Sequence, residues 1–580
     1  MGVPPGRPFS FPWKISIYPS APPDSLPVKR EDIMITISGE GLTLADIVAV
    51  SQGAEVRLSA DPAVLARVEA SQARIEAAVA GGEQVYGVTT LYGGMADQYV
   101  PVERMVELQH IALWHHKTAT GPRLPEADVR AAMLLRVNSL MKGYSGVRLE
   151  LIQRYVSFLN AGVTPHAYQR GSIGASGDLV PLSYIGASVI GLDPAFLVDW
   201  NGETLDCHTA LSRLGLAPLT LRPKEGLAMN NGTTASTGVA ANAMGRGVTV
   251  FALSMAVQAM LAEALLATNQ SFHPTIQAIK PHPGQIFVGS LFRDLLEGSQ
   301  LIRSEAAGAR GHRQGKLIQD RYSLRCLPQY TGPIADMLAV AARQITTEAN
   351  SANDNPLVDP DTGEVYHTGN FLAQYTGVAC DTLRAQLAML LKHLDVQIAM
   401  LVTPEFNNGL PPSLVGNTGH GLNMGLKSLQ LTCNSVAPLV QFYGRSMVDL
   451  YPSHAEQFNQ NINSQAMNAA NLAREAVEAS EHFLAAALVF AVQAVELRAQ
   501  TVRPGYDASD LLSHRNAALY RAARTAALGA PDPERPMLWD DTEGFIQPKV
   551  EGILSDLRTG QAIRDAIGPT LADVEAFLAA

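Results

Sequence analysis

Long apolar helical segments constrain the fold of this chain more than any other feature. After about residue 225 the sequence is dominated by helical patterns at 236–268, 333–353, 376–402, 422–445 and 467–500, several of them longer than twenty residues. Their apolar positions are spread widely around the helix axis, as expected for helices packed on several sides. The sequence therefore predicts a mainly α fold built on a long antiparallel helical bundle.

The N-terminal part of the chain has shorter elements and more glycine. ITISGEGLTLADIVAVSQG indicates a short strand, a turn and a helix, and residues 62–80 and 101–118 have helical periodicity. Between these two helices lies the irregular loop YGVTTLYGGMAD, and a glycine-dense turn, GSIGASGDLVPLS, follows further along. We expect a flexible leader at 1–33, a smaller α+β, loop-rich domain at 34–224 and the helix bundle at 225–580.

Charge and composition argue against several kinds of partner. The formal net charge is −11, and charged residues make up 17% of the chain against 47% apolar residues. An acidic chain without basic patches has no general attraction for nucleic acid or for anionic membranes. The most apolar stretch, 250–267, contains Gln258 and Glu263, which favours a buried bundle helix over a membrane span. So little charge also indicates that apolar surface is covered at a subunit interface.

Cysteine and histidine usage points to a reducing environment and to no metal. The four cysteines lie far apart and form no CxxC pair: Cys207, Cys326, Cys380 and Cys433. A disulfide framework is therefore not expected, and a cytoplasmic location fits. The fourteen histidines are scattered, without HExxH or a compact Cys/His set, so no metal is expected.

The segment GSIGASGD, which contains Ser176, has several interpretations. It lacks the GxGxxG and GK[ST] patterns of phosphate-binding loops and the G-x-S-x-G pattern of a serine nucleophile. An ordinary compact turn is compatible with its glycines and serines. Alternatively, a compressed turn lets the amide nitrogen of Gly177 attack the carbonyl carbon of Ala175. Loss of two waters, one from the Ser176 hydroxyl, then gives a methylidene-imidazolone, an electrophile that protein side chains do not supply.

The same segment, extended to GSIGASGDLVPLSYI, resembles the prosthetic-group segment of the histidine, phenylalanine and tyrosine ammonia-lyase family. Further blocks resemble the family in the same order along the chain: YGVTT at 86–90, GLAMNNGT at 226–233, QDRYSLRC at 319–326, NDNPL at 353–357, PEFNNGLPPSLVG at 404–416 and HAEQFNQNIN at 454–463. The likeness is strongest to bacterial phenylalanine ammonia-lyases. Because it extends over nearly the whole chain after the leader, it favours cyclisation over an ordinary turn.

This resemblance implies a prosthetic group and two catalytic side chains. The group is a 4-methylidene-imidazol-5-one formed autocatalytically from Ala175-Ser176-Gly177, which acts as an electrophile for the substrate amine. Tyr86 matches the base that removes the weakly acidic β-proton, and this role requires a site that favours the phenolate. Arg325 matches the clamp on the substrate carboxylate, because a guanidinium binds both oxygens in one plane.

Other matched positions are expected to hold the prosthetic group and the substrate. Polar residues that resemble the family's polar contacts are Asn231, Gln319, Tyr322 and Asn355. Further substrate-binding positions are Leu227, Phe371, Lys427 and Glu456. A structural ion pair is a second interpretation of Lys427 and Glu456. Any one of these polar residues taken alone would be an ordinary satisfied core residue, so the prediction depends on their joint match.

Ring recognition is expected on ELQHIALWHHKT, the helix after the base loop. His115 stands where phenylalanine-specific members of the resembled family have Phe and tyrosine-specific members have His. His116 replaces a usual Leu, and Ala112 replaces a common Leu one turn earlier, which makes the ring end roomier and more polar. Gln460 is a further candidate at this end. These residues predict a preference for tyrosine or another hydroxylated ring, such as that of dopa, without absolute exclusion of phenylalanine.

Three alternatives stay open from the sequence. An aromatic aminomutase would return the amine to the β-carbon, and Leu91 and Tyr92, in place of the usual Gly and Phe, make the base loop stiffer. A phenylalanine-preferring ammonia-lyase is the second. A helical scaffold without chemistry is the third, and the retained Tyr86, Ser176 and Arg325 argue against it. The resemblance also implies a homotetramer whose active sites are shared between subunits.

Overall fold

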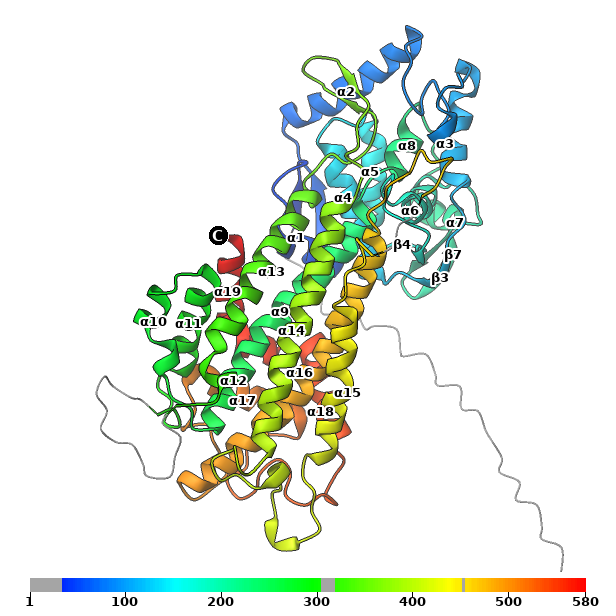
Figure 1. The fold of residues 1–580 in the computed structure, drawn as a ribbon. Coiled ribbons are helices and arrows are strands. Elements are labelled where there is room, and N and C mark those ends of the chain that lie inside the picture. Colours follow the sequence, from blue (N-terminus) through cyan, green and yellow to red (C-terminus); the bar gives the residue numbers. More distant parts are fainter. Residues whose placement is uncertain (1–33, 304–318, 451–453) are drawn as a thin grey trace, which may run out of the picture.

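A bundle of long helices forms the body of the molecule, with a smaller head at one end (Figure 1). The computed structural model describes residues 34–303, 319–450 and 454–580, so the leader expected at 1–33 lies outside the described residues. The long helices are α9 (Thr234–Ala264), α13 (Leu327–Ala349), α14 (Gln374–Val402), α15 (Lys427–Tyr443) and α16 (Ala466–Val502). Each of them lies at a predicted segment, and the mainly α prediction is confirmed.

α9 and α16 form the buried centre of this bundle. By length and composition α9, α14 and α16 could each cross a membrane. The apolar stretches of α9 and α16, however, are 94% buried inside the protein itself. Both helices are rich in alanine, which lets neighbouring helices approach closely on several sides. The apolar segment at 250–267 is therefore mostly part of a core helix.

The predicted helix ends are less accurate than the helices themselves. α13 begins at Leu327, with Pro328 in its first turn, and runs through Pro333, where the sequence pattern predicted its start. Proline is well tolerated in a first turn because its missing N–H has no helical partner there. α15 covers only Lys427–Tyr443 of the predicted 422–445.

The head contains short strands and helices that hold the loops of the site. β1 (Met34–Ile37) pairs in parallel with β2 (Glu55–Leu58), and α1 (Leu44–Ser51) connects them, as the strand–turn–helix pattern predicts. α2 (Pro62–Ala80) matches its prediction at both ends, whereas α3 (Met105–Trp114) stops before the predicted 118. The other helices of the head are α4 (Glu126–Met141), α5 (Leu149–Ala161), α6 (Leu179–Ile190), α7 (Cys207–Arg213) and α8 (Glu225–Asn230).

The remaining strands form small antiparallel sheets. β3 (Thr120–Arg123) pairs with β5 (Tyr168–Arg170). In a three-stranded sheet, β6 (Leu197–Trp200) lies between β4 (Thr164–Pro165) and β7 (Glu203–Asp206). β8 (Leu357–Val358) pairs with β9 (Val365–Tyr366). Shorter helices pack around the bundle: α10 (Pro274–Ala278), α11 (Pro283–Leu296), α12 (Tyr322–Arg325), α17 (His514–Ala527), α18 (Gln547–Thr559) and α19 (Ala562–Ala579). One continuous hydrophobic core joins head and bundle.

Candidate active site

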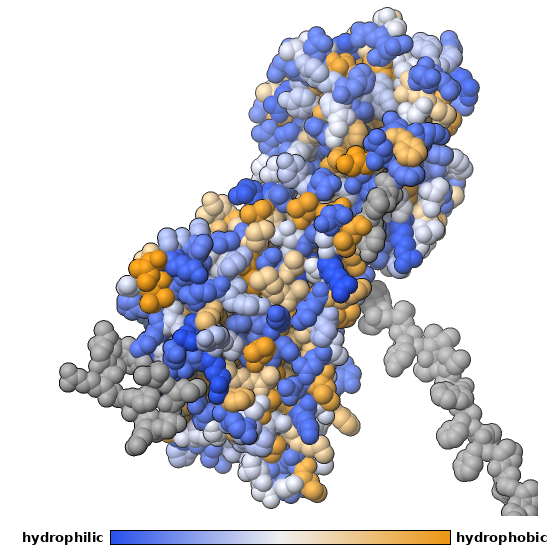
Figure 2. Space-filling view, in the orientation of Figure 1, coloured by the Kyte–Doolittle hydropathy of each residue, from blue (hydrophilic) through white to orange (hydrophobic). Residues whose placement is uncertain are grey.

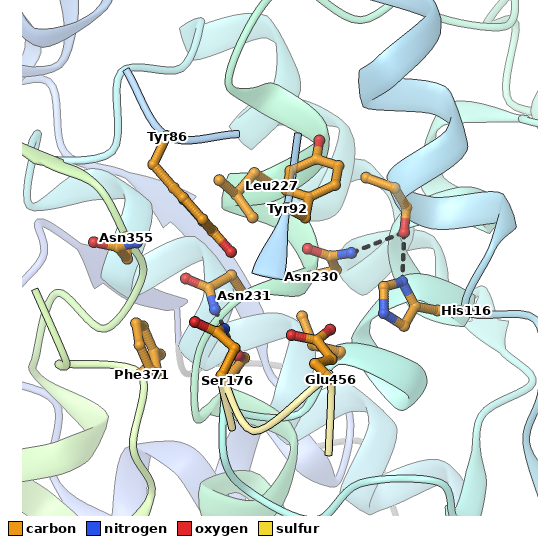
Figure 3. Close-up of a pocket in the computed structure, with 13 residues that line it drawn as sticks. Tyr86, Tyr92, His116, Ser176, Leu227, Asn230, Asn231, Asn355, Phe371 and Glu456 are labelled. Carbon is orange, nitrogen blue, oxygen red and sulfur yellow. Dashed lines mark hydrogen bonds between the residues drawn. The ribbon is translucent and has the colours of Figure 1, made fainter. Parts of the chain in front are cut away.

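A cavity of about 160 Å³ lies in the head, where the loop after α2, the end of α3, the turn before α6 and the end of α8 meet (Figure 3). Its walls are Tyr86, Tyr92, Ala112, His116, Ser176, Leu179, Leu227, Asn230, Asn231, Asn355, Phe371, Glu456 and Asn459. Most of the site residues predicted in the head and in the two segments after α13 and α15 therefore come together in one place. This cavity is the candidate active site.

Ser176 is held at both of its oxygens. Asn231, the residue after α8, donates from Nδ2 to the Ser176 carbonyl oxygen at 2.8 Å. Gln460 donates from Nε2 to the Ser176 hydroxyl at 3.0 Å. The Gln460 amide thus contacts Ser176 in the described chain, and its service at the ring end stays a prediction. The hydroxyl and the carbonyl of the predicted prosthetic-group residue are both oriented by neutral amides.

The turn around Ser176 fits the methylidene-imidazolone that the family resemblance implies. Gly177 has a φ of +70°, and a Cβ added there would lie 2.1 Å from the carbonyl oxygen of Gly232, so only glycine is accommodated. The N–H of Asp178 donates to that same oxygen at 2.7 Å, whereas the Gly177 N–H donates to none of the described residues. The nitrogen that would attack the carbonyl carbon of Ala175 is therefore free of a competing bond within the described part of the chain.

The Tyr86 hydroxyl points into the cavity and accepts a hydrogen bond from the Gly93 N–H at 2.8 Å (Figure 3). Burial raises the pKa of Tyr86, the Gly93 bond opposes this increase, and the Glu456 carboxylate adds to it. Within one chain, the Gly93 N–H is therefore the contact that favours the phenolate, and burial and Glu456 oppose it. One backbone N–H does not offset the desolvation of a charged oxygen beside a carboxylate.

Gln109 connects the loop that carries Tyr86 to α8. It is fully buried in α3, donates from Nε2 to the Gly87 carbonyl oxygen at 3.0 Å, and accepts from the Leu227 N–H at 3.2 Å. Sequence reasoning missed this residue. The available signal was its position one turn before Ala112, on the same face of α3.

His116, and not His115, lines the cavity. Its Nδ1 lies 2.6 Å from the Ala112 carbonyl oxygen, and because a carbonyl only accepts, Nδ1 carries the proton. Asn230, which sequence reasoning missed beside Asn231, donates to the same oxygen at 3.0 Å. Burial lowers the pKa of His116, so the ring is neutral near pH 7 and Nε2 is an acceptor. In Figure 3 this second nitrogen lies on the cavity side of the ring.

His115 is exposed and lies outside the cavity walls in the described chain, so the contact of its imidazole with the substrate ring stays a prediction. α3 ends at Trp114 and His115 is its C-cap residue. One residue later the backbone has turned, and the His116 ring bends back to Ala112. A single step along a helix end changes the direction of a side chain by about 100°, which decides which of two adjacent histidines faces inward.

Three predicted residues form a second cluster away from the cavity. Arg325 donates from Nη1 to Gln319 Oε1 at 2.6 Å, and its guanidinium lies 4.8 Å from the centre of the Tyr322 ring. Arg325 Nε is buried without a partner among the described residues, and Tyr322 is 72% exposed. The cluster therefore presents an incompletely paired cation beside an exposed ring.

The length of α14 separates this cluster from the cavity. Gln397 donates from Nε2 to the Ser323 carbonyl oxygen at 2.8 Å, which fixes α12 beside the C-terminal part of α14. α14 begins at Gln374, shortly after Phe371 in the cavity wall. The 23 helical steps from Gln374 to Gln397 span about 35 Å at the helical rise. Arg325 therefore does not reach the Ser176 turn of its own chain.

Lys427 is also remote from the cavity. It is exposed at the start of α15, after the loop that leaves the C-terminal end of α14. The ion pair between Lys427 and Glu456, one of the two interpretations of these residues, is absent within the described part of one chain. Glu456 instead lies beside Gly93, where an added Cβ would be 2.5 Å from its Oε2.

Across residues 34–303, 319–450 and 454–580 there is no group of three or more His, Cys, Asp or Glu that could hold a metal ion.

Known proteins match the chain over most of its length. The family model for aromatic amino acid lyases matches residues 42–525. The chain is 57% identical to an aromatic ammonia-lyase of Loktanella atrilutea, over 94% of this chain and 100% of that protein. It is 50% identical to a phenylalanine ammonia-lyase of Nostoc punctiforme, over 92% and 94%. Its fold matches the crystal structure of tyrosine aminomutase from Streptomyces globisporus with a TM-score of 0.82 at 29% identity, over 93% and 99%.

Proposed function

Because the chain belongs to the aromatic amino acid lyase family, we propose that it removes ammonia from an aromatic L-amino acid, with tyrosine as the preferred substrate. Tyrosine would give ammonia and trans-p-coumarate, and phenylalanine would give trans-cinnamate. The observation that carries this proposal is the convergence of Tyr86, Ser176 and Asn231 on one cavity. Incubation with tyrosine, dopa, phenylalanine and histidine in turn, with identification of every product, tests it; release of no ammonia from any of them contradicts it.

The residues of the cavity have distinct tasks in this reaction. The β-C–H and α-C–N bonds break, a double bond forms between the two carbons, and ammonia leaves. The methylidene-imidazolone formed from Ala175-Ser176-Gly177 supplies the electrophile that makes the amine a better leaving group. The Tyr86 oxygen accepts the β-proton and is held in place by the Gly93 N–H. Apolar walls such as Leu227 and Phe371 exclude water from the substrate ring.

We propose that the tyrosine preference comes from His116. Its Nδ1–H is bound to the Ala112 carbonyl oxygen, so the neutral ring offers only Nε2, as an acceptor. A para-hydroxyl group is a donor and would fill that position. A bare phenyl ring would leave the acceptor unpaired, which costs binding free energy in a buried site. Ala112 leaves room for the hydroxyl, because it is small and lines the same wall.

Replacing His116 with leucine is expected to reduce kcat/KM for tyrosine by about ten- to a hundredfold, as a lost hydrogen bond with an unpaired hydroxyl predicts. The kcat/KM for phenylalanine should stay level or rise, because leucine adds apolar surface. His115→Leu is the matched control, since it makes the same exchange at the exposed neighbouring position. If His115→Leu reverses the preference and His116→Leu does not, the selectivity belongs to His115.

We also propose a homotetramer in which each active site combines the cavity of one subunit with the Arg325 cluster of another. Two observations support this assembly. The cavity of a single chain has no guanidinium for the substrate carboxylate among its walls. The bundle exposes apolar side chains along α14 and α15: Val378, Val396, Leu431, Leu439 and Phe442. Figure 2 shows hydrophobic residues among the polar ones on the surface of the bundle. Such a surface is typical of a subunit interface.

Mixed assemblies test the shared site directly. Ser176→Ala and Arg325→Ala subunits should each be nearly inactive alone. Co-expressed in equal amounts, they should regain up to about a quarter of wild-type activity. A site is active only when the subunit that supplies Ser176 and the subunit that supplies Arg325 are both intact at that residue, and in random mixtures this holds for about one site in four. Co-expression of Ser176→Ala with the double variant should regain none. An active monomer, or mixed tetramers without recovered activity, would contradict the shared site.

An aromatic aminomutase is the second candidate function. Leu91 and Tyr92 of the base loop pack against the small core of Val100, Met105 and Leu108, so the loop is anchored. An anchored loop would retain the unsaturated acid long enough for ammonia to add back at the β-carbon. A β-amino acid among the products of tyrosine would favour this function over the lyase.

A further inference from the structure

Arg136 is a fully buried cation directly behind the Ser176 turn. It projects from α4, and none of its side chain is exposed. Its Nη1 donates to the carbonyl oxygens of Ala228 and Asn231, at 3.2 and 3.1 Å. Its Nε and Nη2 have no partner among the described residues. A buried guanidinium with incomplete hydrogen bonding is costly, so its position requires an explanation.

The guanidinium packs against Gly232, which in turn packs against Gly177. A Cβ on Gly232 would lie 2.4 Å from Arg136 Nη2, and a Cβ on Gly177 would lie 2.1 Å from the Gly232 carbonyl oxygen. Asn231, on the other side of the same peptide bond, donates to the Ser176 carbonyl oxygen at 2.8 Å. Arg136 therefore fixes the Asn231–Gly232 peptide through the Asn231 carbonyl oxygen. The nitrogen of this peptide would lie 2.6 Å from a Cβ on Gly177, and the Asn231 side chain beside it positions Ser176.

Buried carboxylates favour the charged form of Arg136 without any hydrogen bond to it. Asp354 is bound to Lys224 in a fully buried ion pair at 2.5 Å, and Asp178 accepts from the Ser236 N–H at 2.7 Å and from its hydroxyl at 2.8 Å. Burial lowers the pKa of Arg136, and the charges of Asp354 and Asp178 oppose that decrease. The negative charges of Asp354 and Asp178 therefore favour the protonated guanidinium without contacting it. Its Nη1–H group remains bound to the carbonyl oxygen of Asn231, next to Gly232.

We propose that Arg136 is a positioning residue for the self-modification of Ala175-Ser176-Gly177. By holding the Asn231–Gly232 peptide against Gly177, it keeps the turn compressed enough for the Gly177 nitrogen to reach the Ala175 carbonyl carbon. The inference rests on the proposed function, because the modification supplies the electrophile of that reaction.

The step balances without an added reagent. A bond forms between the Gly177 nitrogen and the Ala175 carbonyl carbon. The Ala175 oxygen leaves as water with the hydrogens of the Gly177 and Ser176 nitrogens, and a C=N bond forms between the Ala175 carbon and the Ser176 nitrogen. The Ser176 hydroxyl leaves as the second water with the Cα hydrogen, and a Cα=Cβ bond forms.

The experiment compares intact masses of the purified wild type with those of Arg136→Met, Arg136→Lys and Arg130→Met. Arg130 is a matched control, because it is a buried arginine on the same helix and is not part of the Ser176 turn. It donates from Nε to the Val50 carbonyl oxygen at 3.1 Å and from Nη1 to the Leu159 carbonyl oxygen at 3.0 Å. The mass reports directly on the loss of two waters, whatever the activity. Thermal unfolding of each variant reports separately on stability.

Arg136→Met is expected to lower the rate of water loss after synthesis by about tenfold or more, as the loss of charge-assisted hydrogen bonds predicts. Arg136→Lys, which keeps the charge but not the fork of donors, should fall between it and the wild type. Arg130→Met should lose stability but keep the wild-type rate. If Arg136→Met does not fold, Arg136→Lys decides the question.

Two results would overturn the inference. One is water loss at the wild-type rate in Arg136→Lys or Arg136→Met. The other is a rate of water loss in Arg130→Met that falls as far as in Arg136→Met, which would indicate general destabilisation. A wild type that keeps the mass of the unmodified chain and is nevertheless active refutes the proposed electrophile instead. These outcomes are distinguishable because the wild-type mass is measured first and independently of the variants.

Discussion

Replacing Ser176 with alanine is expected to leave the fold intact and to reduce kcat for ammonia release by at least about a thousandfold. The methyl group of alanine has no hydroxyl to eliminate, so no methylidene forms and the amine keeps its poor leaving ability. Losses of this size or larger follow the removal of a group that enters covalent catalysis. The fold should persist, because within the described part of the chain the Ser176 hydroxyl accepts a single bond, from the Gln460 amide near the cavity.

Ammonia release and intact mass together check this prediction. The wild type should lack two waters relative to its sequence, and Ser176→Ala should not lose both. Ser188→Ala is a suitable control: it also deletes a buried hydroxyl, bound to the Tyr184 carbonyl oxygen on α6, away from the cavity. Full activity in Ser176→Ala would remove the electrophile from the mechanism and, with it, the role proposed for Arg136.

The long helices and the Ser176 turn could be predicted from the sequence because their signals are local. Apolar positions spread around α9 and α16 specify buried helices, and two small neighbours with a glycine specify a turn that can close. The contact between Asn231 and Ser176 was predicted only through the family resemblance. Nothing in the spacing of residues 55 positions apart indicates such a contact.

Other features of the site depend on geometry that a sequence pattern does not contain. The choice between His115 and His116 depends on where α3 ends, and helix ends are the least certain part of a pattern. The distance between Arg325 and the cavity depends on how α14 is oriented in the bundle. In the sequence Arg136 looks like any polar residue of a helix, and only its burial beside Gly232 distinguishes it.

Replacing Tyr86 with phenylalanine is expected to reduce kcat by roughly 10²- to 10⁴-fold, the range of a positioned general base. Phenylalanine keeps the ring in the cavity wall and removes only the oxygen that accepts the β-proton. Tyr92→Phe is the matched control, because Tyr92 lines the same cavity with its ring centre 6.3 Å from that of Tyr86. Its hydroxyl lies 3.5 Å from the Leu108 carbonyl oxygen, so the control should lose little activity.

The pH profile separates a base from a residue that only packs. The phenolate of Tyr86 is the active form, and burial raises its pKa, so kcat/KM should increase with pH by up to about tenfold per unit below that pKa. The carboxylate of Glu456 also raises the pKa of Tyr86, and Glu456→Gln removes its charge. This variant should therefore shift the rising limb of the pH profile, the range in which kcat/KM increases with pH, to lower pH. Tyr86→Phe should lose the limb entirely. If the limb persists in Tyr86→Phe with the same midpoint, another group removes the proton, and the position of Tyr86 in the cavity serves packing alone.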